Sequence, residues 1–222
     1  MKEGELAELE GEDYIHLTRA LRVRPGEILQ MVDAAGVRFE GHIEGVDRRG
    51  VTLKALRPMP PDPVLPPLRV ALCAPKAAAF EDALDAAVQL GATEFIPLAS
   101  GRSQKLPLDR ADRWQRMVRE SCCQSLRAVP MRILPEQTIA DFLRGDPEGL
   151  RLIAWQGGSG LEPIGSSDPV TLVLGPEGGF EESEMDLALA NGWRPVRLGT
   201  LILRVPVALS AALGAIRAMR RP

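Results

Sequence analysis

The chain has 222 residues, and 45% of them are hydrophobic, which favours one large or two modest folded domains over disorder. Its formal net charge is −3, so it binds RNA only if its arginines are grouped on one surface. The acidic N-terminus has no apolar leader, and the longest apolar run, residues 205–216, is too short to span a membrane. With three cysteines, two of them adjacent, and no metal-ligand spacing, we expect a soluble cytoplasmic protein without a metal site.

The first 57 residues predict a small β-barrel. Short runs rich in β-branched and aliphatic residues are separated by turns, as in a meander of antiparallel strands. The expected strands cover residues 28–32, 37–43 and 51–53. Ahead of them, His16 to Arg22 places apolar residues at positions 17 and 21 and basic ones at Arg19 and Arg22, which predicts a short amphipathic helix.

A proline-rich segment divides the chain. Six of the ten residues 58–67 are proline, and such a run removes backbone donors and favours extended structure. We interpret it as a stiff linker between a domain of residues 1–57 and a domain of residues 68–222. A proline-motif ligand for another protein is the less favoured alternative.

From residue 68 onward, strand and helix patterns alternate, which predicts an α/β fold with a parallel sheet and helices on both faces. Strands are expected at residues 69–74, 94–98, 131–134, 152–155, 170–174 and 194–198. Helices are expected at residues 77–90 and 109–125, after residue 180, and from Pro206, which suits the first position of a helix. The sequence Gly157-Gly158-Ser159-Gly160 lacks the lysine of a phosphate loop and is interpreted as a flexible turn.

Two glycine-containing loops follow neighbouring predicted strands. The strand Val170 to Leu174 carries no charge, which indicates burial on both faces, and Gly175-Pro176-Glu177-Gly178-Gly179 follows it. Gly199 follows the next strand, after Leu198. Either loop alone is compatible with a plain tight turn. Because open α/β sheets bind ligands at the carboxyl ends of their strands, the two loops together favour a ligand pocket.

The sequence Gly175-Pro176-Glu177-Gly178-Gly179-Phe180, with Glu181 to Glu184, Pro195 to Gly199 and Ile202 to Arg204, resembles the C-terminal signature of the RsmE family. Members of this SPOUT-class family methylate N3 of a uridine in 16S ribosomal RNA and use S-adenosylmethionine. The resemblance implies a SPOUT-type parallel sheet with a trefoil knot around residues 170–210, and an N-terminal PUA-like RNA-binding barrel. It also implies a homodimer formed through the C-terminal domain.

The resemblance further implies a set of site residues. Three loops, after Trp155, Leu174 and Leu198, would form the cofactor pocket. Its expected residues are Trp155, Leu174, Gly175, Pro176, Glu177, Gly178, Gly179, Leu198, Gly199, Leu203, Arg204 and Val205. Arg204 would stabilise the charge that develops on the uridine, although a solvated or capping role is an open alternative, and Glu177 is the candidate base. RNA contacts are expected from His16, Arg19, Arg22, Lys76, Arg102, Gln124 and Arg127.

The sequence also departs from the family pattern. Val205-Pro206-Val207-Ala208 stands where the family usually has Thr-Glu-Thr-Ala, and Leu126 stands where it has glycine. We also expect a first strand with basic residues to be missing from the N-terminal domain. These departures leave two alternatives open: a weak or inactive relative that only binds RNA, and an α/β enzyme for another nucleotide ligand.

Overall fold

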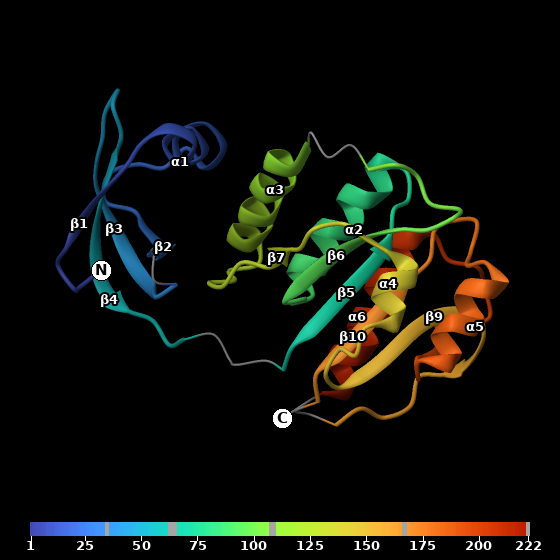
Figure 1. Ribbon diagram of the computed structural model, residues 1–222. Coiled ribbons are helices and arrows are strands. Elements are labelled where there is room, and N and C mark those ends of the chain that lie inside the picture. The colour runs from blue at the N-terminus through green and yellow to red at the C-terminus, as the bar shows by residue number, and fades with distance from the viewer. Residues whose placement is uncertain (34–35, 62–65, 107–109, 166–167, 221–222) are drawn as a thin grey trace. The chain divides into compact units, whose positions relative to one another are not determined.

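The computed structural model describes residues 1–33, 36–61, 66–106, 110–165 and 168–220. The chain forms two compact units, Met1–Pro63 and Val64–Pro222 (Figure 1). The division falls within the predicted linker, whose residues 62–65 lie outside the described residues. Asp109, the expected start of a helix, also lies outside them.

The first unit is a four-stranded antiparallel sheet in the order β1-β4-β3-β2. The strands are β1 (Leu6–Leu9), β2 (Ile28–Val32), β3 (Arg38–Val46) and β4 (Val51–Pro58). Its core consists of Leu17, Ile43, Val51 and Leu53. Leu17 comes from the π-helical segment η1 (His16–Leu21), which continues α1 (Gly11–Ile15) and confirms the predicted short helix.

The first unit does begin with a strand, although it is not a strand with basic residues. β1 pairs with β4 over four residues, from Leu6 opposite Lys54 to Leu9 opposite Val51. It carries Glu8 and no basic side chain. The sequence gives little sign of it, because four residues with two half-buried side chains produce almost no pattern.

The second unit contains a parallel sheet of seven strands in the order β11-β9-β10-β5-β6-β7, with β8 also paired to β6. The six predicted strands are confirmed. The strands are β5 (Leu68–Cys73), β6 (Glu94–Ala99), β7 (Arg132–Ile133), β8 (Gln137–Thr138), β9 (Leu150–Gly160), β10 (Val170–Leu174) and β11 (Arg194–Arg197). The two-residue strand β8 is too short to be recognised from a sequence pattern.

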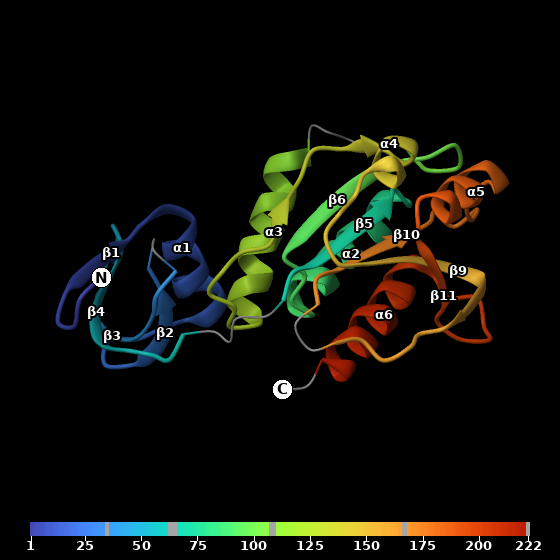
Figure 2. The ribbon, with the colours of Figure 1, turned by 60° about the horizontal axis from the view of Figure 1, so that its bottom comes forward.

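Helices cover both faces of this sheet, as predicted, with α4 and α5 on one side and α6 on the other (Figure 2). The helices are α2 (Ala77–Gln89), α3 (Ala111–Gln124), α4 (Ile139–Arg144), α5 (Glu182–Ala190) and α6 (Val205–Met219). Alternate residues of β5 enter two cores: Val70 and Leu72 pack with α2, α3 and α6, whereas Ala71 and Cys73 pack with α4 and α5. None of the helices in the described part of the chain is long and apolar enough to cross a membrane.

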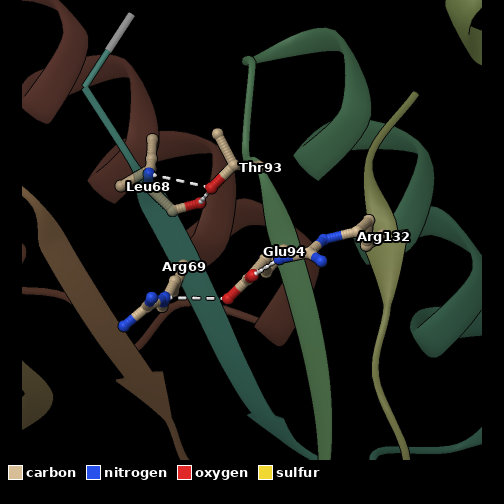
Figure 3. A network of polar contacts seen from close by, with 5 residues as sticks. All are labelled: Leu68, Arg69, Thr93, Glu94 and Arg132. Carbon is tan, nitrogen blue, oxygen red and sulfur yellow. Dashed lines mark hydrogen bonds and ion pairs between the residues drawn. The ribbon is translucent and has the colours of Figure 1, made fainter. Parts of the chain in front are cut away.

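At the amino end of this sheet, polar side chains fix the register of three strands (Figure 3). Glu94 of β6 lies between Arg69 of β5 and Arg132 of β7 and forms an ion pair with each; the distance from Arg69 Nε to the carboxylate is 2.8 Å. Thr93 Oγ1 lies 3.1 Å from both the main-chain nitrogen and the carbonyl oxygen of Leu68. A slip of one residue would break all of these contacts.

The interpretation of residues 157–160 as a flexible turn is wrong, because β9 continues through them. Ser159 and Gly160 pair with Val196 and Arg197 of β11 after a shift of register. A Cβ atom on Gly158 would lie 2.6 Å from the carbonyl carbon and oxygen of Pro195. The glycine therefore permits a close approach of two strands.

Helix α6 begins one residue earlier than expected. Arg204 is its N-cap and Val205 its first residue, so Pro206 takes the second position, where a missing N–H is equally harmless. The side chains of Leu209, Ala212, Leu213 and Ile216, spaced at three and four residues, form a buried apolar stripe along α6. Because α6 starts beside the carboxyl ends of the strands, its first turn is part of the site described next.

Candidate active site

A cavity of about 450 Å³ lies at the carboxyl ends of β10 and β11 and beside the middle of β9. Its walls are these parts of the strands, the loops that follow β10 and β11, and the first turns of α6. We call it the cofactor cavity, because the sequence predicts a cofactor pocket formed by these loops. The lining residues are Ala154, Trp155, Gln156, Leu174, Gly175, Pro176, Glu177, Gly179, Phe180, Val196, Leu198, Ile202, Leu203, Arg204, Val205 and Ala208.

Most of the predicted cofactor residues line this cavity. Those that do are Trp155, Leu174, Gly175, Pro176, Glu177, Gly179, Leu198, Leu203, Arg204 and Val205. Gly178 and Gly199 belong to the same loops but are not among the lining residues. Trp155 contributes from within β9, and no loop follows it directly.

Sequence reasoning missed six lining residues, Ala154, Gln156, Phe180, Val196, Ile202 and Ala208. Phe180 and Ile202 belong to the recognised motif, so they could have been predicted as lining residues from the motif itself. Ala208 lies on α6 one turn after Arg204, and helical spacing would have found it. Ala154 and Gln156 gave no signal, because the chain was expected to leave the sheet after Trp155.

The segment Gly175–Gly179, which we call the glycine loop, is folded against the ring of Phe180. A Cβ on Gly175 would lie 3.0 to 3.2 Å from three ring carbons of Phe180. Gly179 has a φ of 70°, in the left-handed region, and its N–H donates to the Pro176 carbonyl at 2.9 Å. Gly175 and Gly179 are therefore glycines for a structural reason, the first because of the close Phe180 ring and the second because of its positive φ.

The acidic run after Phe180 caps helix α5. The main-chain nitrogen of Glu181 donates to the carboxylate of Glu184 at 2.8 Å, and the Glu181 side chain accepts from the third residue of the helix. This reciprocal capping box satisfies N–H groups that a helix leaves open at its start. Glu184 is buried, so the beginning of α5 is fixed relative to the glycine loop.

The two candidate catalytic residues occupy different walls of the cofactor cavity. Glu177 is exposed in the glycine loop, and Arg204 is exposed at the N-cap of α6. Beside Arg204, the buried side chain of Val205 makes the wall apolar. The carboxylate and the guanidinium are thus the charged groups at the cavity among the described residues.

The predicted RNA contacts fall into two groups. His16, Arg19 and Arg22 are exposed on η1 and its C-cap in the first unit, and Lys76 and Gln124 are exposed in the second. Arg102, which is also exposed, and Arg127, which is half-buried, both donate to main-chain carbonyls of the fold. Arg127 donates to the carbonyls of Val88 and Val129, and Arg102 to the carbonyls of Gly178 and Phe180.

Comparison with known families gives two matches that follow the two units. A model of an RNA methyltransferase domain matches residues 62–217, and a model of an RNA methyltransferase PUA domain matches residues 9–56. The ribosomal RNA small subunit methyltransferase E of Synechocystis sp. is 31% identical over 92% of this chain and 70% of its own. The chain belongs to the RsmE family.

Further RsmE proteins and solved structures agree. The Mycobacterium bovis protein of the same name is 29% identical over 96% of this chain and 86% of its own. A structure of the Neisseria gonorrhoeae RsmE protein bound to S-adenosyl methionine has a TM-score of 0.89 at 26% identity, with 99% and 94% of the chains covered. A Legionella pneumophila putative methyltransferase with bound cofactor has a TM-score of 0.86 at 25% identity, with 98% and 93% covered.

These matches confirm the predicted family and its fold, a parallel SPOUT-type α/β sheet with an N-terminal PUA-like domain.

Proposed function

We propose that this protein transfers a methyl group from S-adenosylmethionine to N3 of a uridine in 16S ribosomal RNA. The observation that carries the proposal is the cofactor cavity, which the glycine loop and the loop before α6 line together. It lies in the fold of an RsmE protein and a second methyltransferase that were both solved with this cofactor.

The cavity suits the cofactor in size and character. A volume of about 450 Å³ is typical of small-molecule sites, and mostly apolar walls with a few polar groups are usual for them. Leu174, Val196 and Leu198 offer apolar surface for a purine base. The main chain of the glycine loop offers hydrogen-bonding groups that need no particular side chain. When bound, S-adenosylmethionine supplies an electrophilic methyl group on a sulfonium.

The residues of this chain must then make uridine N3 nucleophilic. The N3 imide has to lose its proton before or during the attack, and the resulting charge spreads to O2 and O4. Arg204 would stabilise that charge from the start of α6, and Glu177 would accept the proton. Both line the cofactor cavity, which supports these roles.

RNA would be bound through exposed basic and polar side chains of both units. We propose His16, Arg19 and Arg22 in the PUA-like unit, and Lys76 and Gln124 in the methyltransferase unit, with the charged ones facing the phosphate backbone. Arg127 would contribute only its electrostatic field, since its guanidinium donates to main-chain carbonyls.

We further propose a cytoplasmic homodimer with a trefoil knot around residues 170–210. The dimer is supported by apolar side chains around the start of α6, since Leu201 is 74%, Ile202 92% and Val207 53% exposed. A second copy covering them would remove this apolar surface from water. The cytoplasm is supported by free cysteines at positions 73, 122 and 123.

One observation favours the alternative of an RNA-binding relative without activity. The apolar Val205 is buried beside Arg204, where the family pattern has a hydroxyl followed by a carboxylate. A weak enzyme and an inactive one differ in whether ribosomal RNA carries the methyl group.

Mass mapping of 16S RNA from a strain that lacks the gene tests this proposal. We expect one methyluridine to be absent and to return on complementation with the intact gene, but not with the Arg204→Ala variant. Unchanged RNA in the deletion strain, together with RNA binding by the purified protein, would instead support the inactive relative.

A further inference from the structure

The loop after β6 lies directly against the glycine loop. Arg102 Nη1 is 3.1 Å from the carbonyl oxygen of Gly178 and 3.3 Å from that of Phe180. A Cβ on Gly178 would lie 3.5 Å from the Cβ and Cδ atoms of Arg102, so the stem of the arginine packs along the same backbone. One guanidinium nitrogen therefore links two peptide groups of a segment that borders the cofactor cavity.

Each of these two peptide groups is hydrogen-bonded through both its oxygen and its nitrogen. A trans peptide directs its C=O and its N–H to opposite sides. In the Gly178–Gly179 peptide the oxygen accepts from Arg102 while the nitrogen donates to Pro176 at 2.9 Å. In the Phe180–Glu181 peptide the oxygen again accepts from Arg102, and the nitrogen donates to Glu184 at 2.8 Å. Only one peptide lies between them, and it joins Gly179 to Phe180, which both line the cavity.

The backbone around Arg102 is itself held by hydrogen bonds. The main-chain nitrogen of Ser100 donates to Ser103 Oγ at 2.9 Å, and Ser103 Oγ lies 3.1 Å from the carbonyl oxygen of Ser100. The nitrogen of Gln104 donates to Ala74, just after β5, at 2.8 Å. The loop is thus a closed turn tied to the neighbouring strand.

A neighbouring residue connects the same two segments. The main-chain nitrogen of Gly101 donates to the carboxylate of Glu184 at 3.3 Å. A Cβ on Gly101 would lie 2.5 Å from Oε1 of Glu181. The loop after β6 therefore contacts both the glycine loop and the start of α5.

We propose that Arg102 is a positioning residue for the cofactor: it orients the two peptides that flank Gly179–Phe180, so that the glycine loop is set to receive S-adenosylmethionine. This inference rests on the cofactor site proposed above. It gives Arg102 a role different from the RNA contact expected from the sequence, because its Nη1 donor is directed at the glycine loop.

The test compares Arg102→Ala, Arg102→Lys and a control, Arg144→Gln, in the full chain. Arg144 is an exposed arginine of α4 whose partner is Asp141 in the same helix. We expect Arg102→Ala to weaken S-adenosylmethionine binding about tenfold by calorimetry, and Arg102→Lys about threefold, since an ammonium restores the charge but not the guanidinium geometry. The control should bind like the parent.

Kinetic and RNA-binding measurements separate positioning from other roles. We expect the KM for S-adenosylmethionine to rise with its Kd in Arg102→Ala, while kcat at saturating cofactor and the Kd for RNA stay within about twofold of the parent. If Arg102→Ala fails to fold, Arg102→Lys is decisive.

Equal cofactor affinity in the parent and both Arg102 variants would overturn the inference, as would a loss confined to RNA binding. A parent protein that does not bind S-adenosylmethionine would overturn the proposed function as well, and this result is distinguishable because it does not depend on the variants.

Discussion

The two ends of the seven-stranded sheet use charged side chains differently. At the amino end, arginines form contacts that stabilise the fold. Arg69 and Arg132 pair with Glu94, and Arg217 donates to the carbonyls of Leu90 and Gly91 at 2.9 and 2.6 Å. At the carboxyl end, the cofactor cavity has apolar walls and main-chain groups, with Glu177 and Arg204 exposed at its edge. The charged side chains at the amino end serve the fold, whereas at the carboxyl end Arg102 and Glu184 serve the fold and Glu177 and Arg204 are available for chemistry.

The comparison explains why counting arginines in the sequence misleads. Arg217 and Arg220, near the end of α6, reach carbonyls outside the helix. These are the carbonyls of Leu90 and Gly91 for Arg217 and those of Pro66 and Asp168 for Arg220. Burial lowers the pKa of both guanidinium groups, which is a cost that such contacts offset.

The largest effect is expected at the carboxyl end. Arg204→Ala should lower kcat about 100-fold, because removal of one group that stabilises a developing oxyanion costs roughly 3 kcal/mol. Steady-state kinetics with 16S RNA measure it, and the Kd for S-adenosylmethionine should change less than about threefold. The matched control is Arg194→Ala, at the first residue of β11 and outside the cavity lining, which should keep the parent kcat. Parent kinetics in Arg204→Ala would refute the catalytic role.

At the amino end the same kind of change should affect stability alone. Arg217→Met removes the donors to Leu90 and Gly91 and leaves two carbonyls unpaired, so we expect the free energy of unfolding to fall by about 2 kcal/mol. Urea denaturation measures this loss. Arg144→Met breaks a surface pair within α4 and should cost less than about 0.5 kcal/mol. A loss of cofactor affinity in folded Arg217→Met would contradict the division between the two ends.

Inside the sheet, the last residue of β5 gives a prediction about alkaline pH. Burial raises the pKa of the Cys73 thiol from 9.0 to about 12. The folded state therefore keeps this proton above pH 9 while the unfolded state loses it, and the contribution to stability declines as the pH rises from 9 towards 12. Between pH 9 and 10 the free energy of unfolding should fall about 1 kcal/mol more in the parent than in Cys73→Ala. Identical pH slopes would show that this thiol does not titrate on unfolding.

The smallest effect is expected after α3, where the sequence departs from the family pattern. Leu126 has a φ of 54°, in the left-handed region, and its side chain is 54% exposed. Leu126→Gly should relieve this strain and, after the added entropy of the unfolded chain, stabilise the protein by about 0.5 kcal/mol. Thermal unfolding at several scan rates detects the gain, and a lower Tm would show that the leucine side chain contributes more than its backbone costs.

The repeating elements of the fold were predictable because their patterns are long. The uncharged run Val170 to Leu174 is fully buried in the middle of the sheet, and the α6 stripe lies in the core. The short elements β1, β8 and α4 were not predicted, because segments of two to six residues show little periodicity. The glycines at 157–160 were misinterpreted because the partner strand that requires Gly158 is nearly 40 residues away in the chain.

Residues of the candidate site could be predicted where they belong to the recognised motif. Residues that only the tertiary fold brings to the site could not. The glycine loop and Arg204 were found from the motif. Arg102 was predicted to contact RNA, and its hydrogen bonds to the carbonyls of Gly178 and Phe180 could not be foreseen, because these residues lie 76 and 78 positions further along the chain.

Calorimetric titration of S-adenosylmethionine into the parent protein and Ala208→Phe tests the central claim most directly. Ala208 lines the cofactor cavity from α6, so a phenyl ring there would occupy the space of the ligand, whereas Ala218→Phe places the same ring on an exposed part of the helix. We predict one cofactor per chain for the parent and for Ala218→Phe, and no binding for folded Ala208→Phe. Equal binding by all three proteins would contradict the assignment of this cavity.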